Sequence, residues 1–251
     1  MVRLVQFSDT HLRSSQWRHQ RGFSRAVRRA GPADLVLVTG DLSVDGADEV
    51  ADLKAAKARF DRLTAPVHVI PGNHDIGEEP ACPRQIQPVT KERRARFISV
   101  FGDDSFDISL PGWRLMGLNV HLFGTGWEEE AQQWDRLENA VRARGTDRIA
   151  VFLHKPVYVE QPDEPENAYW AIPANARERL LSLAENGNIA VFSSGHLHQG
   201  LIRQHAGTHH VWVPATANAA REPRTHGTLL MTGAAVWNFE PGRFRVRFVT
   251  S

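Results

Sequence analysis

The sequence predicts a layered α/β fold, because short apolar runs alternate with helical patterns along most of the chain. Five runs are continuous, rich in β-branched residues and short enough to be buried strands. They cover residues 4–7, 35–38, 67–70, 149–153 and 189–192. Three stretches between the runs have helical periodicity, namely residues 48–63, 128–143 and 175–185.

The C-terminal part of the chain predicts hairpins instead of helices. Two pairs of strand-like segments are each joined by a turn-like sequence that contains glycine. The pairs are residues 201–205 with 210–213, and residues 228–239 with 244–249. Antiparallel hairpins beside parallel strands make the predicted sheet mixed.

Length and composition limit the classes of protein to which this chain can belong. The 251 residues fit one domain, spanning residues 1–251, with a sizeable core. No stretch approaches the ~20 apolar residues of a membrane span. The net charge of +1 gives no broad basic field, so nucleic acid is not expected as a partner. Cys82 is the only cysteine and the N-terminus does not resemble a signal peptide, so a cytoplasmic location is expected.

Each of the five apolar runs ends in side chains that commonly bind metals. Because open α/β sheets build their sites beyond the carboxyl ends of their strands, these side chains are expected to meet. Carboxylate and imidazole ligands suit Zn, Fe, Mn or Co, and cysteine is absent from the set. In strand order, the residues are Asp9 and His11; Asp41; Asn73, His74 and Asp75; His154; and His196 and His198.

Spacing predicts how some of these side chains point. In an extended segment Asp9 and His11 face the same way, so both can bind one ion. His196 and His198 have the same spacing, and each could instead face a different ion. A glycine precedes Asp41, Asn73 and His196, which fits tight turns that bring the backbone close to a ligand.

The ordered motifs D-x-H, G-D, G-N-H-D, H and G-H-x-H resemble those of the calcineurin-like metallophosphoesterase superfamily. The resemblance runs from Asp9 to His198, and the segment SGHLHQ is most similar to the bacterial class III cyclic-nucleotide phosphodiesterases. It implies a single metallophosphoesterase domain with a four-layer α/β/β/α sandwich. Two mixed sheets would then carry a dinuclear metal site at the C-terminal ends of their strands.

The resemblance also implies roles for the site residues. Two divalent ions (Mn, Fe, Zn or Co) would share Asp41 as a bridging ligand. His74 would be the catalytic histidine, Asp75 would orient it, and Asn73 and His74 would contact substrate. The remaining ligands would be Asp9, His11 and His198 for one ion, and Asn73, His154 and His196 for the other.

The function expected from this resemblance is a metal-dependent phosphodiesterase that attacks with a hydroxide held between two ions. The substrate would be a small phosphate ester, with 3′,5′-cyclic nucleotides first. A phosphomonoesterase, a nuclease or lipid-headgroup phosphodiesterase, and a non-catalytic scaffold remain alternatives, and a homo-oligomer stays open. Among other residues, Cys82 is expected to be inert and His121 to be structural or to border the cleft. Trp127, Tyr169 and Trp170 are expected either to form an aromatic wall beside a base or leaving group or to pack within the protein.

Overall fold

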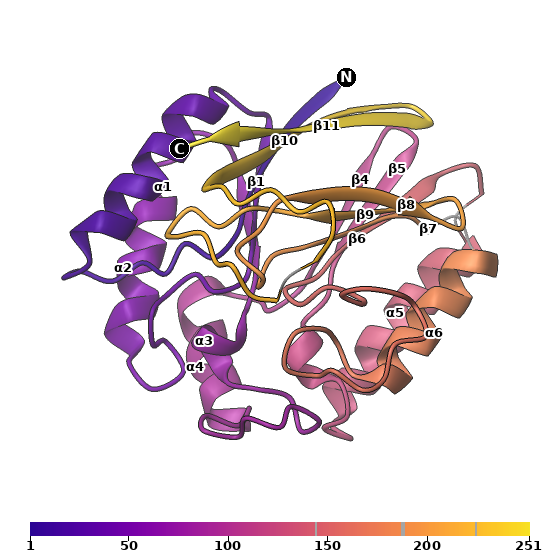
Figure 1. The fold of residues 1–251 in the computed structure, drawn as a ribbon, viewed down its shortest axis with the longest axis horizontal. Helices are drawn as coiled ribbons and strands as arrows, with labels where there is room; N and C mark the ends of the chain where they lie inside the picture. The colour runs from indigo at the N-terminus through magenta and orange to yellow at the C-terminus, as the bar shows by residue number, and fades with distance from the viewer. Residues whose placement is uncertain (144, 187–188, 224) are drawn as a thin grey trace.

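Two mixed β-sheets pack face to face in the computed structural model, which describes residues 1–143, 145–186, 189–223 and 225–251 (Figure 1). The first sheet has the strand order β11-β10-β1-β2-β3. Its three N-terminal strands are parallel, and the β10–β11 hairpin adds two antiparallel strands. The strands are β1 (Val2–Phe7), β2 (Leu35–Thr39), β3 (Val67–Ile70), β10 (Gly233–Glu240) and β11 (Arg243–Thr250).

The second sheet has the order β4-β5-β6-β7-β9-β8, with a parallel centre and an antiparallel strand at each edge. Sequence patterns predicted its centre and its β8–β9 hairpin, but not the edge hairpin of β4 and β5. The strands are β4 (Phe106–Leu110), β5 (Trp113–Gly117), β6 (Arg148–Phe152), β7 (Ile189–Ser194), β8 (Leu201–His205) and β9 (Thr208–Trp212). Residues 228–232, expected to open the last hairpin, precede strand β10 instead.

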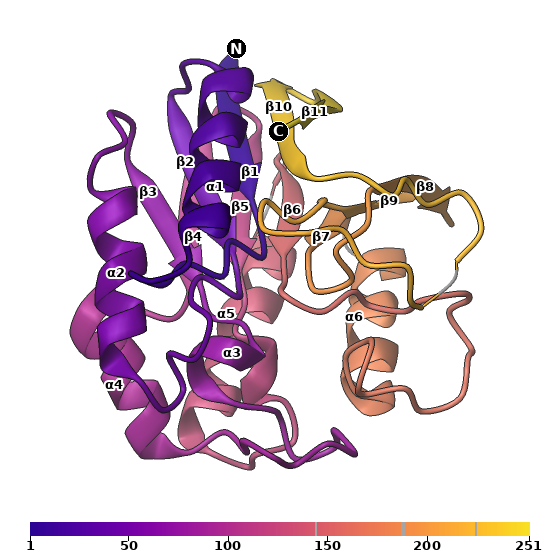
Figure 2. The ribbon, with the colours of Figure 1, turned by 60° about the vertical axis from the view of Figure 1, so that its left-hand side comes forward.

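Helices cover the two outer faces of the paired sheets (Figures 1 and 2). The first sheet is covered by α1 (Trp17–Ala30), α2 (Val50–Phe60) and α4 (Lys91–Phe101). The second is covered by α5 (Glu128–Ala143) and α6 (Ala174–Asn186). Two short elements, α3 (Asn73–Ile76) and η1 (Val120–Leu122), lie in the loops that follow strands.

Three apolar layers hold these four layers of structure together. The middle layer joins the sheets and includes Leu4 and Trp237 from the first and Trp113 and Phe152 from the second. One outer layer lies under α1, α2 and α4, and the other lies under α5 and α6. The predicted four-layer α/β/β/α sandwich is therefore confirmed.

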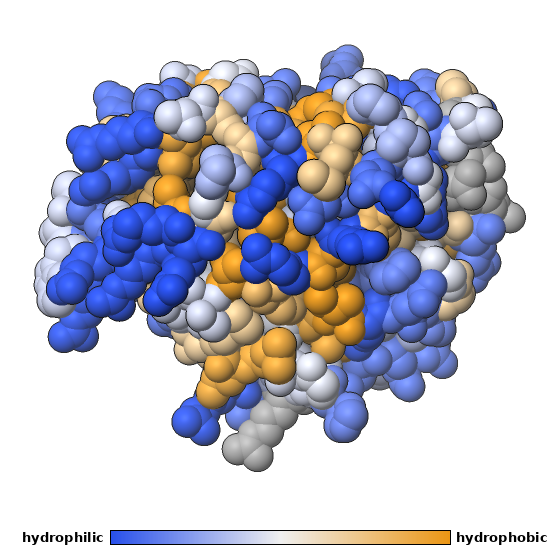
Figure 3. Space-filling view, turned by 90° about the horizontal axis from the view of Figure 1, so that it is seen from above, coloured by the Kyte–Doolittle hydropathy of each residue, from blue (hydrophilic) through white to orange (hydrophobic). Residues whose placement is uncertain are grey.

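Among the residues that the structure describes, no helix is both long enough and apolar enough to cross a membrane. Figure 3 shows hydrophilic side chains spread over the face seen from above, with hydrophobic areas between them.

Candidate metal centre

The predicted ligands meet beyond the ends of β1, β2, β3, β6 and β7 in two adjoining groups. One group is Asp9, His11, Asp41 and His198, and the other is Asp41, His154 and His196; within each, the ligand atoms lie within 4.8 Å of one another. Asn73 extends the second group, because its Oδ1 lies 3.2 Å from the Nε2 of His154. Asp41 belongs to both groups.

The backbone at these positions is unusual. Of the six non-glycine residues with positive φ in the described chain, five are predicted ligands: Asp9, His11, Asp41, His196 and His198. Such conformations are uncommon for residues with a Cβ and gather at functional sites. This corrects one prediction, because Asp9 and His11 converge through left-handed residues after β1 and not through an extended segment.

The glycines before the ligands allow close approach, as predicted. A Cβ on Gly40 would lie 2.2 Å from the Nδ1 of His154, and one on Gly72 would lie 2.2 Å from the Oδ1 of Asp41. A Cβ on Gly195 would lie 1.8 Å from the Oγ of Ser8. These distances are far below van der Waals contact, so only glycine fits.

Hydrogen bonds fix the rings of the second group. The Nδ1 of His154 donates to the Thr39 carbonyl at 3.0 Å, and the Nε2 of His196 donates to the Tyr169 carbonyl at 2.8 Å. In a neutral ring the other nitrogen then carries a lone pair. Those two nitrogens lie 3.2 Å apart, so a cation between them is favoured over two neutral rings.

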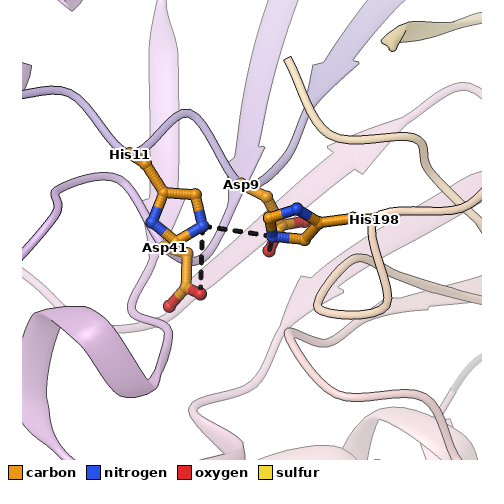
Figure 4. Close-up of side chains that lie close together, drawn as sticks. All are labelled: Asp9, His11, Asp41 and His198. Carbon is orange, nitrogen blue, oxygen red and sulfur yellow. Dashed lines mark hydrogen bonds and ion pairs between the residues drawn. The ribbon is translucent and has the colours of Figure 1, made fainter. Parts of the chain in front are cut away.

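The first group is built in the same way. The Nδ1 of His198 donates to the Asn218 carbonyl at 2.9 Å, leaving its Nε2 3.1 Å from the Nε2 of His11. Figure 4 shows these rings beside the carboxylates of Asp9 and Asp41, with all four side chains pointing toward one another. Backbone partners that orient the far nitrogen are typical of histidines that bind metals. The donor set of each group therefore fits a divalent cation.

The carboxylates and imidazoles of the centre shift one another's pKa values. Burial opposes ionisation of Asp41, but His154 and His74 outweigh it and hold its pKa well below the usual range. Burial lowers the pKa of His11 to about 3. Burial also acts against protonation of His154, yet Asp41 and Asp9 raise its pKa to about 9. The two carboxylates thus favour positive charge at His154, while burial keeps His11 neutral.

His74 lies beside the two groups and remains partly accessible, with 43% of its side chain exposed. Its Nδ1 donates to the Val44 carbonyl at 2.7 Å, and its Nε2 lies 3.9 Å from the Oδ2 of Asp41. The Asp41 carboxylate, opposed by burial, raises the pKa of His74. An accessible, oriented imidazole of this kind suits proton transfer.

The expected role of Asp75 in orienting or polarising His74 stays a prediction, and the hydrogen bonds of Asp75 go to other partners. The Asp75 carboxylate accepts hydrogen bonds from the backbone of Leu42, Ser43 and Gly72 and from the Ser43 hydroxyl. It therefore shapes the loop that carries Asp41. Burial, followed by the Asp41 charge, raises the pKa of Asp75 to about 6.

The centre opens into a pocket of about 710 Å³. Tyr169 and Trp170 line it, as one prediction allowed, whereas Trp127 packs under Lys91 against the core beneath α4. His19 also lines the pocket and bonds to the His11 carbonyl at 2.8 Å, a position with no signal in the sequence.

Cys82 is not among the residues that line the pocket. It is buried, and burial raises the pKa of its thiol to about 11, which fits the predicted inert role.

Comparison with known proteins gives matches to phosphoesterases. Residues 2–200 match the family model for calcineurin-like phosphoesterases. The human serine/threonine-protein phosphatase CPPED1 is 27% identical over 61% of this chain and 47% of its own length, so the chain spans about half of that relative. The 3′,5′-cyclic adenosine monophosphate phosphodiesterase CpdA of Pseudomonas aeruginosa is 28% identical over 81% of this chain and 72% of that protein.

Solved structures share the fold. A dimetal phosphatase from Danio rerio superposes with a TM-score of 0.64 at 14% identity, covering 98% of this chain and 95% of that one. The purple acid phosphatase PPD1 of yellow lupin gives a TM-score of 0.70 at 13% identity, covering 99% of this chain and 51% of that one. With the family-model match over most of its length and the ligand-type side chains gathered at the strand ends, this chain belongs to the calcineurin-like phosphoesterase family.

Proposed function

We propose that the protein is a phosphodiesterase that uses two divalent metal ions to hydrolyse a small phosphate diester. The observation that carries this proposal is the sharing of Asp41 between the two ligand groups. When bound, the ions would supply Lewis acidity toward the phosphate oxygens and activate water for in-line attack.

The side chains around the ions have complementary roles. Asp9 and Asp41 are both buried carboxylates that balance part of the metal charge. Asn73, at the edge of the second group, donates through its amide to a non-bridging phosphate oxygen. His74, next to Asn73 and open to the pocket, holds a proton on Nε2 and passes it to the leaving alkoxide oxygen.

A diester is favoured over a monoester by the pocket and by one relative. About 710 Å³ accommodates groups on both sides of a phosphate, and Tyr169 and Trp170 line part of this space. The Pseudomonas relative, named for hydrolysis of a cyclic diester, aligns over more of this chain than the human phosphatase does. Cyclic nucleotides are accordingly the first substrates to test.

A phosphomonoesterase is the second candidate, supported by the similarity to the human phosphatase. The two candidates separate when rates on bis(p-nitrophenyl) phosphate and p-nitrophenyl phosphate are compared in Mn²⁺. Faster turnover of the diester supports the proposal and leads to a screen of cyclic nucleotides and glycerophosphodiesters. Faster turnover of the monoester would transfer the assignment to a phosphatase.

A further inference from the structure

Lys155 follows the predicted ligand His154 and is completely buried. Its ammonium donates three hydrogen bonds, to the carboxylates of Glu78 and Glu79 at 2.8 Å each and to the Ala168 carbonyl at 2.7 Å. An ammonium has three protons, so all of them are used. Lysine is almost never fully buried without such partners.

The surroundings of Lys155 exclude a third metal site there. Glu78, Glu79 and His121 have the spacing of a possible metal cluster, but the Lys155 ammonium already lies between the two carboxylates. The Nδ1 of His121 donates to Glu79 at 2.9 Å, while its buried Nε2 has no hydrogen-bond partner in the described part of the chain. An imidazole in this state is neutral, so Lys155 provides the positive charge of the cluster.

The three bonds of Lys155 join segments that are distant in the sequence. Glu78 and Glu79 lie in the loop after α3, and Ala168 lies in the segment between β6 and α6. Ala168 directly precedes Tyr169, whose carbonyl orients His196. Lys155 therefore supports the piece of backbone that both orients a predicted ligand and carries the Tyr169–Trp170 wall.

A second tie connects the same two segments at the surface. Arg84, from the loop after α3, stacks on the Tyr169 ring with its guanidinium carbon 4.0 Å from the ring centroid. Its Nη1 also donates to the Tyr169 hydroxyl at 2.7 Å. Arg84, Tyr169 and Trp170 all line the pocket, as does Glu78. The buried cluster thus reaches the pocket through Glu78 on one side and the aromatic wall on the other.

We propose that Lys155 is a positioning residue for substrate binding, because its buried ammonium holds residues 168–170 so that the Tyr169–Trp170 wall stands beside the metal ligands. The wall then favours diesters whose second substituent, the one that stays on the phosphorus, is large and flat over diesters in which that substituent is small. This inference rests on the proposed phosphodiesterase function for its kinetic consequence, but not for the positioning itself.

The variant that tests this proposal must remove the hydrogen bond from Lys155 to the Ala168 carbonyl without leaving an unpaired buried charge. Lys155→Met alone leaves the buried carboxylates of Glu78 and Glu79 without a positive partner and is expected to unfold the chain. The combination of Glu78→Gln, Glu79→Gln and Lys155→Met keeps similar volumes, carries no charge and deprives the Ala168 carbonyl of its donor. Lys57→Met serves as the control, since Lys57 lies at the surface and pairs with Asp61.

Two measurements on the triple variant test the positioning role of Lys155: backbone hydrogen exchange and KM. The backbone amides of Ala171 and Ile172, bonded to Asn167 and Pro156, should exchange hydrogen faster than in wild type and the control. In saturating Mn²⁺, KM for bis(p-nitrophenyl) phosphate should rise about tenfold, as expected for lost ring contacts. The KM for methyl p-nitrophenyl phosphate, which lacks the second ring, should rise much less, and kcat should stay near wild type for both esters.

Unchanged amide exchange would overturn the positioning role, and equal KM changes on both esters would overturn the selection by the wall. Bound metal is measured in parallel, so that loss of ions is not mistaken for a weaker substrate contact. If wild type hydrolyses neither ester, the proposed function fails, while the exchange result still decides whether Lys155 positions the segment.

Discussion

The Oδ1 of Asp41 lies 3.3 Å from the Nε2 of His154, and the second oxygen of the same carboxylate lies 3.6 Å from the Nε2 of His11. One side chain therefore faces a ring from each ligand group. An uncharged amide at this position offers only one oxygen and no negative charge, so it cannot serve both groups.

Asp41→Asn should lose one of two bound metals and nearly all phosphoesterase activity. Metal content after gel filtration and the rate on bis(p-nitrophenyl) phosphate check this prediction. Asp61→Asn, which changes an exposed carboxylate paired with Lys57, should keep both ions. Two retained metals with full activity in Asp41→Asn would refute the bridging role.

His74→Ala should keep both metals but slow turnover by ~10²–10⁴-fold, the usual contribution of a general acid. Its ring nitrogens contact the Val44 carbonyl and approach Asp41, so its removal leaves the ligand groups in place. The loss should shrink when the leaving group is nitrophenolate, which needs little protonation. Equal losses on alkyl and nitrophenyl esters would argue against proton donation by His74.

Gly195→Ala should displace Asp9 and weaken metal binding, because the new Cβ would lie 1.8 Å from the Ser8 Oγ and 2.4 Å from the Asp9 Oδ2. Metal affinity and the melting temperature report the effect. Gly207→Ala is the matched control: it also adds a methyl group, but in open space at a positive φ, so it should cost about 1 kcal/mol of stability and no metal. Equal metal affinity in the two variants would contradict the close-packing argument.

Glu79 gives a pH-dependent prediction for stability. Burial raises its pKa, but the hydrogen bond from His121 and the charge and hydrogen bond of Lys155 prevail and lower it from 4.5 to about 2. A depressed folded-state pKa stabilises the fold above pH 4.5, and this contribution, on the order of 3 kcal/mol, disappears as the pH falls toward 2. The difference in unfolding free energy between wild type and Glu79→Gln should therefore be largest above pH 4.5.

Urea unfolding of both proteins between pH 3 and 7 measures that difference. Carboxylates other than Glu79 titrate in both proteins and cancel. A difference that stays constant across this range would show that the pKa of Glu79 is the same in the folded and unfolded chains, which contradicts the prediction.

The sequence was most informative where one physical cause dominates. Continuous apolar runs marked the central strands, because both faces of those strands are buried. The sequence did not predict the edge strand β4, because its exposed and half-buried residues alternate and it has no continuous apolar run. Only a tight turn separates β4 from β5, so the sequence shows no clear boundary between the two strands. Ligand-type residues at five strand ends predicted the convergence of the site, since the topology of such sheets requires it.

Other features depend on contacts that are distant in the sequence. The left-handed conformations of Asp9 and His11 follow from backbone bonds to Gly40 and Asp41, which no local pattern reveals. The role of Asp75 likewise depends on the loop after β2. Burial of Lys155 was not predictable, because a lysine beside a polar loop is ordinarily solvated until two carboxylates enclose it.

The central claim is metal-dependent hydrolysis of a phosphate diester, and one titration tests it directly. Protein stripped of metal is mixed with increasing Mn²⁺, and both bound metal and the rate on bis(p-nitrophenyl) phosphate are followed. The account predicts no rate in stripped protein and full activity only when two ions are bound per chain. Full activity without metal, or two bound ions with no rate on any phosphate ester, would contradict it.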